Sequence, residues 1–220
     1  MIRRGLLPSH VLVLKNTDSA ALPGQAPGAI AHSRASGEDW SEADFDIASP
    51  LETILEAAGI DYRIAPSRDI NDADVVALIA ERPEHVMIYS GYGGVLLRRD
   101  VLNTGKRFLH IHGGYLPTYK GSTTNYFSLL ADNQMGASAI FLTADIDSGP
   151  ILARRIFPAP GDRAQIDHIY DSAARAKVLI EVLTKYRDSG TWTIERENEG
   201  GETFYVIHPV LKHIAILAEK

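Results

Sequence analysis

The sequence contains no cysteine, which excludes disulfides, thiolate metal sites and a cysteine nucleophile. It has no apolar run long enough to cross a membrane, and its first apolar segment is broken by Pro8 and lacks a small-residue cleavage site. We therefore expect neither a transmembrane helix nor a signal peptide. A chain of 220 residues can bury a substantial core without disulfides or a structural metal. These features together fit a cytoplasmic protein.

Positive charge is also in deficit. The 22 lysines and arginines are outnumbered by 28 acidic residues, giving a formal net charge of −6. A protein that holds nucleic acid through its overall field needs the opposite balance. We expect a small-molecule partner, with no nucleic acid and no membrane, while the oligomeric state stays open with a homodimer as one option.

Short apolar segments of strand type alternate with helix patterns along the chain. Helices are expected over 50–58 and 71–82, and an antiparallel strand over 151–158. The other expected strands cover residues 10–15, 61–65, 85–90, 107–112 and 138–143. Such alternation predicts an α/β fold: a Rossmann-like, mostly parallel sheet with helices on both faces.

The pattern divides the chain into a large domain and a short tail. Residues 16–46 are rich in Ala, Ser, Gly, Pro and acid, which predicts a long loop. A long helix is expected to begin near Asp162, followed by one strand and one short helix in the tail. Its expected inward residues are Ile166, Ile169, Ala173, Ala176, Ile180 and Leu183. We predict an α/β domain over 1–190 and a strand/helix appendage over 191–220.

Two histidines stand at the end of the fourth expected strand. Side chains alternate along a strand, so His110 and His112 project from the same face. In α/β sheets, ligands bind at the carboxyl ends of parallel strands. The pair is therefore a catalytic edge, a metal site, or two hydrogen-bonded histidines under a loop.

A second polar stretch follows the next strand. Asp145 and Asp147 precede Ser-Gly-Pro between two strand-like segments, a pattern that by itself describes a polar turn. Two imidazoles and one carboxylate are also the donor set of a zinc or non-haem iron site. A metal-dependent enzyme using His110, His112 and Asp147 is thus one alternative.

These motifs together resemble the folate-dependent formyltransferases. The matching residues are a strand ending in His112, the following Gly-Gly-Tyr-Leu-Pro and Tyr-Lys-Gly, and Asp-Ser-Gly-Pro-Ile beginning 35 positions after that histidine. The resemblance runs from about residue 86 to residue 156. It implies a formyltransferase-like fold and 10-formyltetrahydrofolate as co-substrate.

The resemblance also implies roles for single residues. His112 and Asp147 match the family's catalytic histidine and aspartate, and His110 stands where the family has a catalytic asparagine that donates a hydrogen bond to the formyl oxygen. The implied cofactor-binding residues are Gly91, Tyr92, Gly93, Gly94, Leu96, Phe141, Leu142, Ala144, Asp145 and Ile146. The implied substrate-binding residues are Tyr115, Lys120, Asn125 and Tyr126.

The reaction expected from this constellation is formyl transfer to the amine of a small molecule, with a nucleotide-linked amino sugar as the expected acceptor. His112, oriented by Asp147, would take the amine proton, and His110 would face the oxyanion. Two further alternatives keep the fold: a formyltetrahydrofolate hydrolase, which uses water in place of the amine, and a non-catalytic folate or nucleotide binder.

Overall fold

The computed structural model describes residues 1–15, 49–91 and 94–218. The expected loop over 16–46 and the expected cofactor-binding residues Tyr92 and Gly93 lie outside the described residues. The described elements are η1 (Ile2–Arg4), β1 (Val11–Val13), α1 (Leu51–Ala57), β2 (Tyr62–Ile64), α2 (Ala73–Glu81), β3 (Val86–Tyr89), α3 (Arg99–Leu102), β4 (Arg107–His112), β5 (Tyr119–Gly121), α4 (Thr124–Asp132), β6 (Gln134–Phe141), β7 (Ile151–Pro158), η2 (Arg163–Gln165), η3 (Ile166–Tyr170), α5 (Asp171–Ser189), β8 (Glu202–Phe204) and α6 (Pro209–Leu217).

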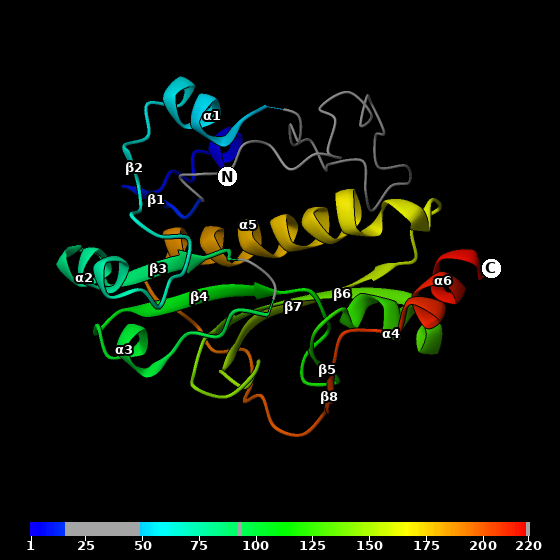
Figure 1. Cartoon of the computed structure of the whole chain (residues 1–220). Coiled ribbons are helices and arrows are strands. Elements are labelled where there is room, and N and C mark those ends of the chain that lie inside the picture. The colour runs from blue at the N-terminus through cyan, green and yellow to red at the C-terminus, as the bar shows by residue number, and fades with distance from the viewer. Residues whose placement is uncertain (16–48, 92–93, 219–220) are drawn as a thin grey trace.

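The main sheet has the strand order β3-β4-β6-β7 (Figure 1). β3 and β4 are parallel, whereas β6 runs antiparallel to both β4 and β7. β1 pairs with β2, and β5 with β8, both in parallel. The α/β, Rossmann-like class is confirmed, and so is the antiparallel strand over 151–158. The main sheet is mixed, because the strand that includes residues 138–141 runs antiparallel to both of its neighbours.

The path of the chain after β4 explains the reversed strand. A parallel strand requires a crossover that returns the chain to the amino end of its neighbour. Here α4 stays at the carboxyl end of β4, and Asn133 ends it with a left-handed φ of 53°. β6 therefore enters the sheet at that same end, where Ser138 pairs with His112.

Alternation along β4 gives the sheet two different faces. Leu109 and Ile111 belong to the core shared with α5, whereas Phe108 packs in a separate cluster with residues of α2 and α3. Figure 1 shows α5 and α3 on opposite sides of the sheet, which confirms the expected helices on both faces. His110 and His112 share the face of Phe108, because they lie two and four residues beyond it.

The long helix begins as expected but presents a different face. The Asp162 side chain accepts a hydrogen bond from the Ala164 amide, and a 3-10 turn and a π-helical turn then lead into α5. Ile166, Ile169 and Ala173 are buried as expected, whereas Ala176, Ile180 and Leu183 are only partly buried. Ala174, Val178 and Val182 are buried in their place. A π turn holds more residues than an α turn, so it shifts the inward face along the chain.

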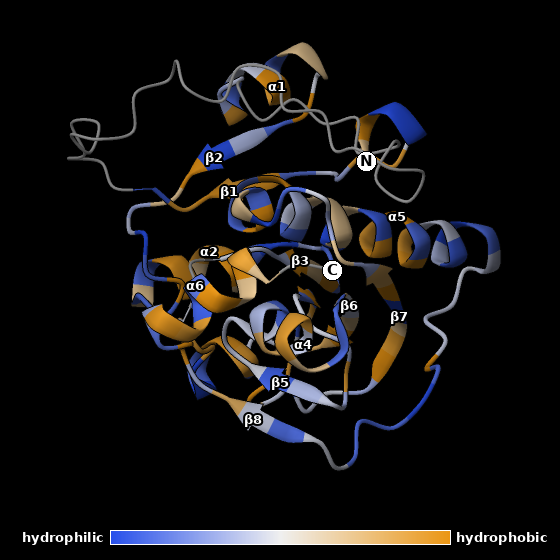
Figure 2. Ribbon diagram, turned by 90° about the vertical axis from the view of Figure 1, so that its right-hand side faces the viewer, coloured by the Kyte–Doolittle hydropathy of each residue, from blue (hydrophilic) through white to orange (hydrophobic). Residues whose placement is uncertain are grey.

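The tail contains the expected strand and helix, β8 and α6, and both pack on the rest of the chain. β8 adds to β5, and α6 contacts α4. In Figure 2, β7 is largely hydrophobic, whereas β5 and β8 are mostly hydrophilic or neutral. Within the described residues, no helix combines the length and apolar character needed to span a membrane.

Shortening Leu109 tests the core between β4 and α5. This side chain has 0% exposure, so Leu109→Ala should lower the free energy of unfolding by about 2–5 kcal/mol through lost burial and a residual cavity. Leu7→Ala is the matched control, because Leu7 is 55% exposed. Urea denaturation of both variants measures the difference, and equal losses would contradict this packing.

Candidate active site

The side chains of His110 and His112 lie on the same side of the sheet as the loop after β6. That loop brings Asp147 to His112, with Oδ2 of Asp147 3.3 Å from Nδ1 of His112. The prediction that the carboxylate and His112 meet is therefore confirmed. The chemical roles of these residues stay predictions.

His112 is held on both sides of its ring. Its Nε2 lies 2.7 Å from the Tyr119 carbonyl oxygen, and the residue is only 4% exposed. A carbonyl oxygen only accepts hydrogen bonds, so Nε2 carries a proton and donates a hydrogen bond to the Tyr119 oxygen. In the neutral ring, Nδ1 is then the unprotonated nitrogen, and it faces the Asp147 carboxylate. A hydrogen bond between Nδ1 of His112 and the Asp147 carboxylate requires one further proton, carried by either group.

Asp147 is fixed by its neighbours in an uncommon conformation. Its φ is 46°, in the left-handed region that non-glycine residues seldom adopt. The Gly121 amide donates to its Oδ2 at 2.8 Å, and Nδ2 of Asn198 donates to its backbone oxygen at 2.6 Å. The same Asn198 nitrogen donates to the Gly149 oxygen at 3.0 Å. These bonds hold the turn so that the carboxylate points at His112.

His110 is anchored through the opposite ring nitrogen. Its Nδ1 lies 3.0 Å from the Tyr89 carbonyl oxygen on β3, so Nδ1 carries the proton of the neutral ring. Nε2 then has a free lone pair. The neutral ring cannot donate the hydrogen bond expected for the oxyanion, because its one N–H is already used.

Burial sets the charge of both rings. It lowers the pKa of the His112 imidazole, and Asp147 and the bond to Tyr119 oppose that effect only in part. Burial also lowers the pKa of His110, with Arg175 and His112 acting in the same direction and the bond to Tyr89 and Asp147 opposing it. Both histidines are therefore more readily neutral than a solvent-exposed histidine.

A cleft of about 660 Å³ contains this site. Its lining combines the turn after β3, the end of β4, the start of α4, the loop after β6 and part of the carboxyl-terminal segment. The predicted site residues that line it are Gly91, Gly94, Leu96, His110, His112, Asn125, Tyr126, Leu142, Ala144, Asp145, Ile146 and Asp147. The sequence thus identified segments that the fold brings to one cavity.

Three predicted residues do not line the cleft. The Phe141 ring lies on the other face of the sheet, in edge contact with Trp192, because it is out of phase with Ile140. Tyr115 lies beneath the Arg154 guanidinium, 4.5 Å from the ring centre. Lys120 is buried with its ammonium 3.4 Å from the Asn198 carbonyl oxygen. The structure therefore gives their side chains packing contacts in place of the expected ligand contacts.

Asn125 and Tyr126 line the cleft, but protein groups engage both. Asn125 donates to Asp171 at 2.9 Å and accepts from the Gly136 amide at 2.8 Å. Burial raises the pKa of the Tyr126 hydroxyl, and a hydrogen bond with Asp167 raises it further. Asn125 thus ties α4 to both α5 and β6, which is a structural task.

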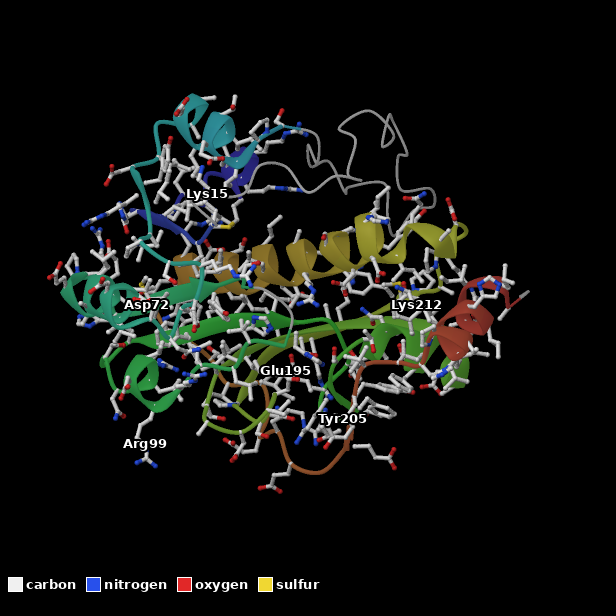
Figure 3. The ribbon with its side chains drawn as sticks, viewed as in Figure 1. Lys15, Asp72, Arg99, Glu195, Tyr205 and Lys212 are labelled. Carbon is white, nitrogen blue, oxygen red and sulfur yellow. The ribbon has the colours of Figure 1, made fainter. Side chains whose placement is uncertain are left out.

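Sequence reasoning missed three residues around the site. Asn198 holds the Asp147 turn, and no motif marks it. Arg175 donates to the Ile111 carbonyl oxygen and pairs with Asp171, both at 2.6 Å. The i, i+4 spacing of Asp171 and Arg175 was a usable signal for their pairing, although not for their place in the cleft. Tyr205, labelled in Figure 3, also lines the cleft from the carboxyl-terminal segment.

The metal alternative lacks geometric support. Across the described ranges, no three His, Asp or Glu side chains are grouped so that they could hold a metal ion. The carbonyl contacts of His110 and His112 do not bear on this question, because a metal-bound histidine also donates its other ring N–H to such a partner.

A buried histidine in contact with a carboxylate, at a cleft of an α/β sheet, is an arrangement that can transfer protons. The sequence model of the Formyl transferase family matches residues 16–183. The chain belongs to this family, which confirms the resemblance seen in its motifs.

Curated relatives point to the same family. The chain is 30% identical over 163 residues to methionyl-tRNA formyltransferase of Herpetosiphon aurantiacus, covering 74% of this chain and 45% of the relative. It is 32% identical over 162 residues to the enzyme of the same name from a Roseiflexus species, covering 72% of this chain and 48% of that one. The chain thus spans about half the length of the curated relatives it matches.

Solved structures share the fold. Methionyl-tRNA formyltransferase from Clostridium thermocellum has a TM-score of 0.54 at 15% identity, covering 77% of each chain. HypX from Aquifex aeolicus in complex with tetrahydrofolic acid has 0.55 at 15%, covering 75% of this chain and 28% of that one. The formyltransferase PseJ from Anoxybacillus kamchatkensis, in complex with a UDP-linked formamido sugar and tetrahydrofolate, has 0.50 at 19%, covering 71% and 80%.

Asn198 supplies a stability test of the Asp147 turn. Asn198→Ala removes donors from two carbonyl oxygens and should lower the free energy of unfolding by about 1–3 kcal/mol, because buried acceptors lose their partners. Asn103→Ala is the control, since Asn103 is exposed. Denaturant unfolding measures both, and a variant as stable as the control would show that the turn holds without Asn198.

Proposed function

We propose that this protein transfers the formyl group of 10-formyltetrahydrofolate to an amine. Family membership supports the reaction, and the tetrahydrofolate in the HypX and PseJ structures supports the folate co-substrate. The observation that carries the proposal is the 3.3 Å contact of His112 with Asp147 on the wall of a cleft large enough for a flat heterocycle.

The folate would occupy the part of the cleft lined by residues 94–97 and 142–146. Val95 and Leu96 supply exposed apolar surface there, which suits the faces of a pterin. The loop over 142–146 also offers backbone amides and carbonyls to ring nitrogens. In this pose the formyl group lies toward the two histidines.

The amine would bind on the side of Asp147. An ammonium group is attracted to that carboxylate, but it has to lose a proton before its nitrogen can attack the formyl carbon. Attack creates a tetrahedral oxyanion, and the bond between the formyl carbon and folate N10 then breaks. Holding both reactants in one desolvated cleft favours each step through proximity and orientation.

A nucleotide-linked amino sugar is the acceptor class we favour. Asp145, Asp147, Asp167 and Asp171 line the cleft, and the one arginine among its described lining residues, Arg175, is already paired with Asp171. An acidic lining attracts the ammonium group of the sugar, so the diphosphate of such an acceptor would have to lie outside the acidic lining. A net charge of −6 disfavours a tRNA held by many phosphate contacts. The PseJ complex with a UDP-linked formamido sugar supports this choice.

Methionyl-tRNA is the second candidate, because curated relatives at 30% and 32% identity carry that name. Tetrahydrofolate release from 10-formyltetrahydrofolate should be measured without an amine, with UDP-linked amino sugars and with methionyl-tRNA. We expect release with an amino sugar alone. Release without an amine would indicate a hydrolase, and folate binding with no release under any condition would indicate a non-catalytic binder.

Removing either member of the His112–Asp147 pair should strongly reduce formyl transfer. Asp147→Asn and His112→Asn should each lower kcat/KM at least about a hundredfold, since the charge and the orientation that the pair supplies beside the reacting groups are lost. Asp188→Asn is the control, because that side chain is 61% exposed on the last turn of α5. Near-normal turnover in either site variant would remove that residue from the mechanism.

A further inference from the structure

The two histidines of β4 are anchored to backbone carbonyls through different nitrogens. His112 donates from Nε2 to Tyr119, and its Nδ1 faces Asp147, so both nitrogens meet protein oxygens. His110 donates from Nδ1 to Tyr89, and no described residue makes a hydrogen bond with its Nε2. Within the described part of the chain, Oδ1 of Asn198 is the one fully buried side-chain nitrogen or oxygen that lacks a hydrogen-bond partner. Nε2 of His110 therefore lacks a partner without being fully buried.

His110 lines the cleft, so its free nitrogen is open to a bound substrate. A neutral imidazole with Nδ1–H has a basic lone pair at Nε2. The ring nitrogen best placed to accept a proton from a ligand is therefore that of His110. In His112 the corresponding position is occupied by the Tyr119 carbonyl.

Building on the proposed function, we propose that Nε2 of His110 is the base that takes the proton of the attacking amine and returns it to folate N10. In the first step, the N–C bond forms, an N–H bond of the adduct breaks and an Nε2–H bond forms. In the second step, the C–N10 bond breaks while that proton moves from Nε2 to N10. The products are a formamide and tetrahydrofolate, and the ring returns to its neutral form.

The same ring would serve the oxyanion between these steps. Once protonated, His110 has a second N–H directed into the cleft, next to the negative charge created by attack. A charge-assisted hydrogen bond of this kind is stronger than one from a neutral donor. The ring thus acts on the proton and then on the charge, in that order.

The groups around His110 decide how activity depends on pH. Arg175 on α5 and His112 on β4 disfavour its protonation, and Asp147 on the loop after β6 favours it. Tyr89 on β3 contributes its carbonyl, and its ring centre lies 6.1 Å from that of His110. Burial has the largest effect and lowers the pKa of His110. The active neutral ring is therefore present at neutral pH and is lost as pH falls through this lowered pKa.

A donor role for His110 predicts the opposite trend. If the ring had to enter the reaction as an imidazolium, activity would be lost as pH rises. His110→Asn separates the two roles, because an amide at the Nδ1 position can keep donating to Tyr89 while it offers no basic nitrogen. His110→Gln places the amide at the Nε2 position and is the matched variant.

Formyl transfer should be measured from pH 5 to pH 9 with 10-formyltetrahydrofolate and the acceptor that supports turnover. We expect both variants to lose at least about a hundredfold in kcat at neutral pH and to lose the acidic limb of the wild-type profile. An acidic limb that remains belongs to the acceptor amine. Wild-type rates in His110→Asn, or activity that falls with rising pH through this limb in the wild type, would overturn the proposal.

An independent measurement keeps this inference separate from the proposed reaction. Nitrogen-15 NMR of the histidine rings reports which nitrogen of His110 is protonated, assigned by comparison with His110→Asn. We expect Nδ1 protonated and Nε2 bare at neutral pH, and a bare Nδ1 would overturn the proposal whatever the enzyme turns over. Absence of formyl transfer to every acceptor, together with the expected tautomer, would instead reject formyl transfer and with it the shuttle.

Discussion

The left-handed turn at Asp147 is the constraint on which the site depends. A φ of 46° is costly for an aspartate, so the conformation persists only where neighbours fix it. The Gly121 amide fixes the carboxylate and Asn198 fixes the backbone on both sides of the turn. Gly149 completes the turn, because a Cβ there would overlap the Phe141 carbonyl oxygen. These local contacts place the carboxylate against His112.

Two of those supports come from distant parts of the chain. Asn198 lies beyond residue 183, where the family match ends, and Gly121 belongs to β5, which pairs with β8. The Ser122 amide donates to the Phe204 carbonyl oxygen at 2.9 Å, and Thr123 accepts from the Ile207 amide at 2.9 Å. The carboxyl-terminal segment is thus part of the site's structure, because its hydrogen bonds help to hold the Asp147 turn and the residues after β5 in place.

The sequence predicted what depends on periodicity and motif. It located the strand with His110 and His112, the turn with Asp147, the α/β class and the tail's strand and helix, because each has a local signal. It could not predict the antiparallel direction of β6, which depends on α4 ending near the carboxyl end of β4. Nor could it find Asn198, whose role exists only after residues far apart in the sequence meet. The shifted inward face of α5 could not be predicted either, because no residue pattern marks the π turn that precedes this helix.

The tautomers of the two histidines had to come from the structure as well. Alternation along a strand places His110 and His112 on one face and makes them look equivalent, yet the backbone carbonyl that each ring meets is different. His112 lies against the start of β5, where the Tyr119 carbonyl oxygen accepts a hydrogen bond from its Nε2–H. His110 lies beside β3, where the Tyr89 carbonyl oxygen accepts a hydrogen bond from its Nδ1–H, so that Nε2 faces the cleft without a proton. Since a carbonyl only accepts, each contact assigns one proton and thereby leaves one lone pair. The hydrogen bond that anchors residue 110 to β3 needs only one donor, which Nδ1 of His110 supplies. The histidine therefore has a second ring nitrogen, in the cleft, through which a proton can pass.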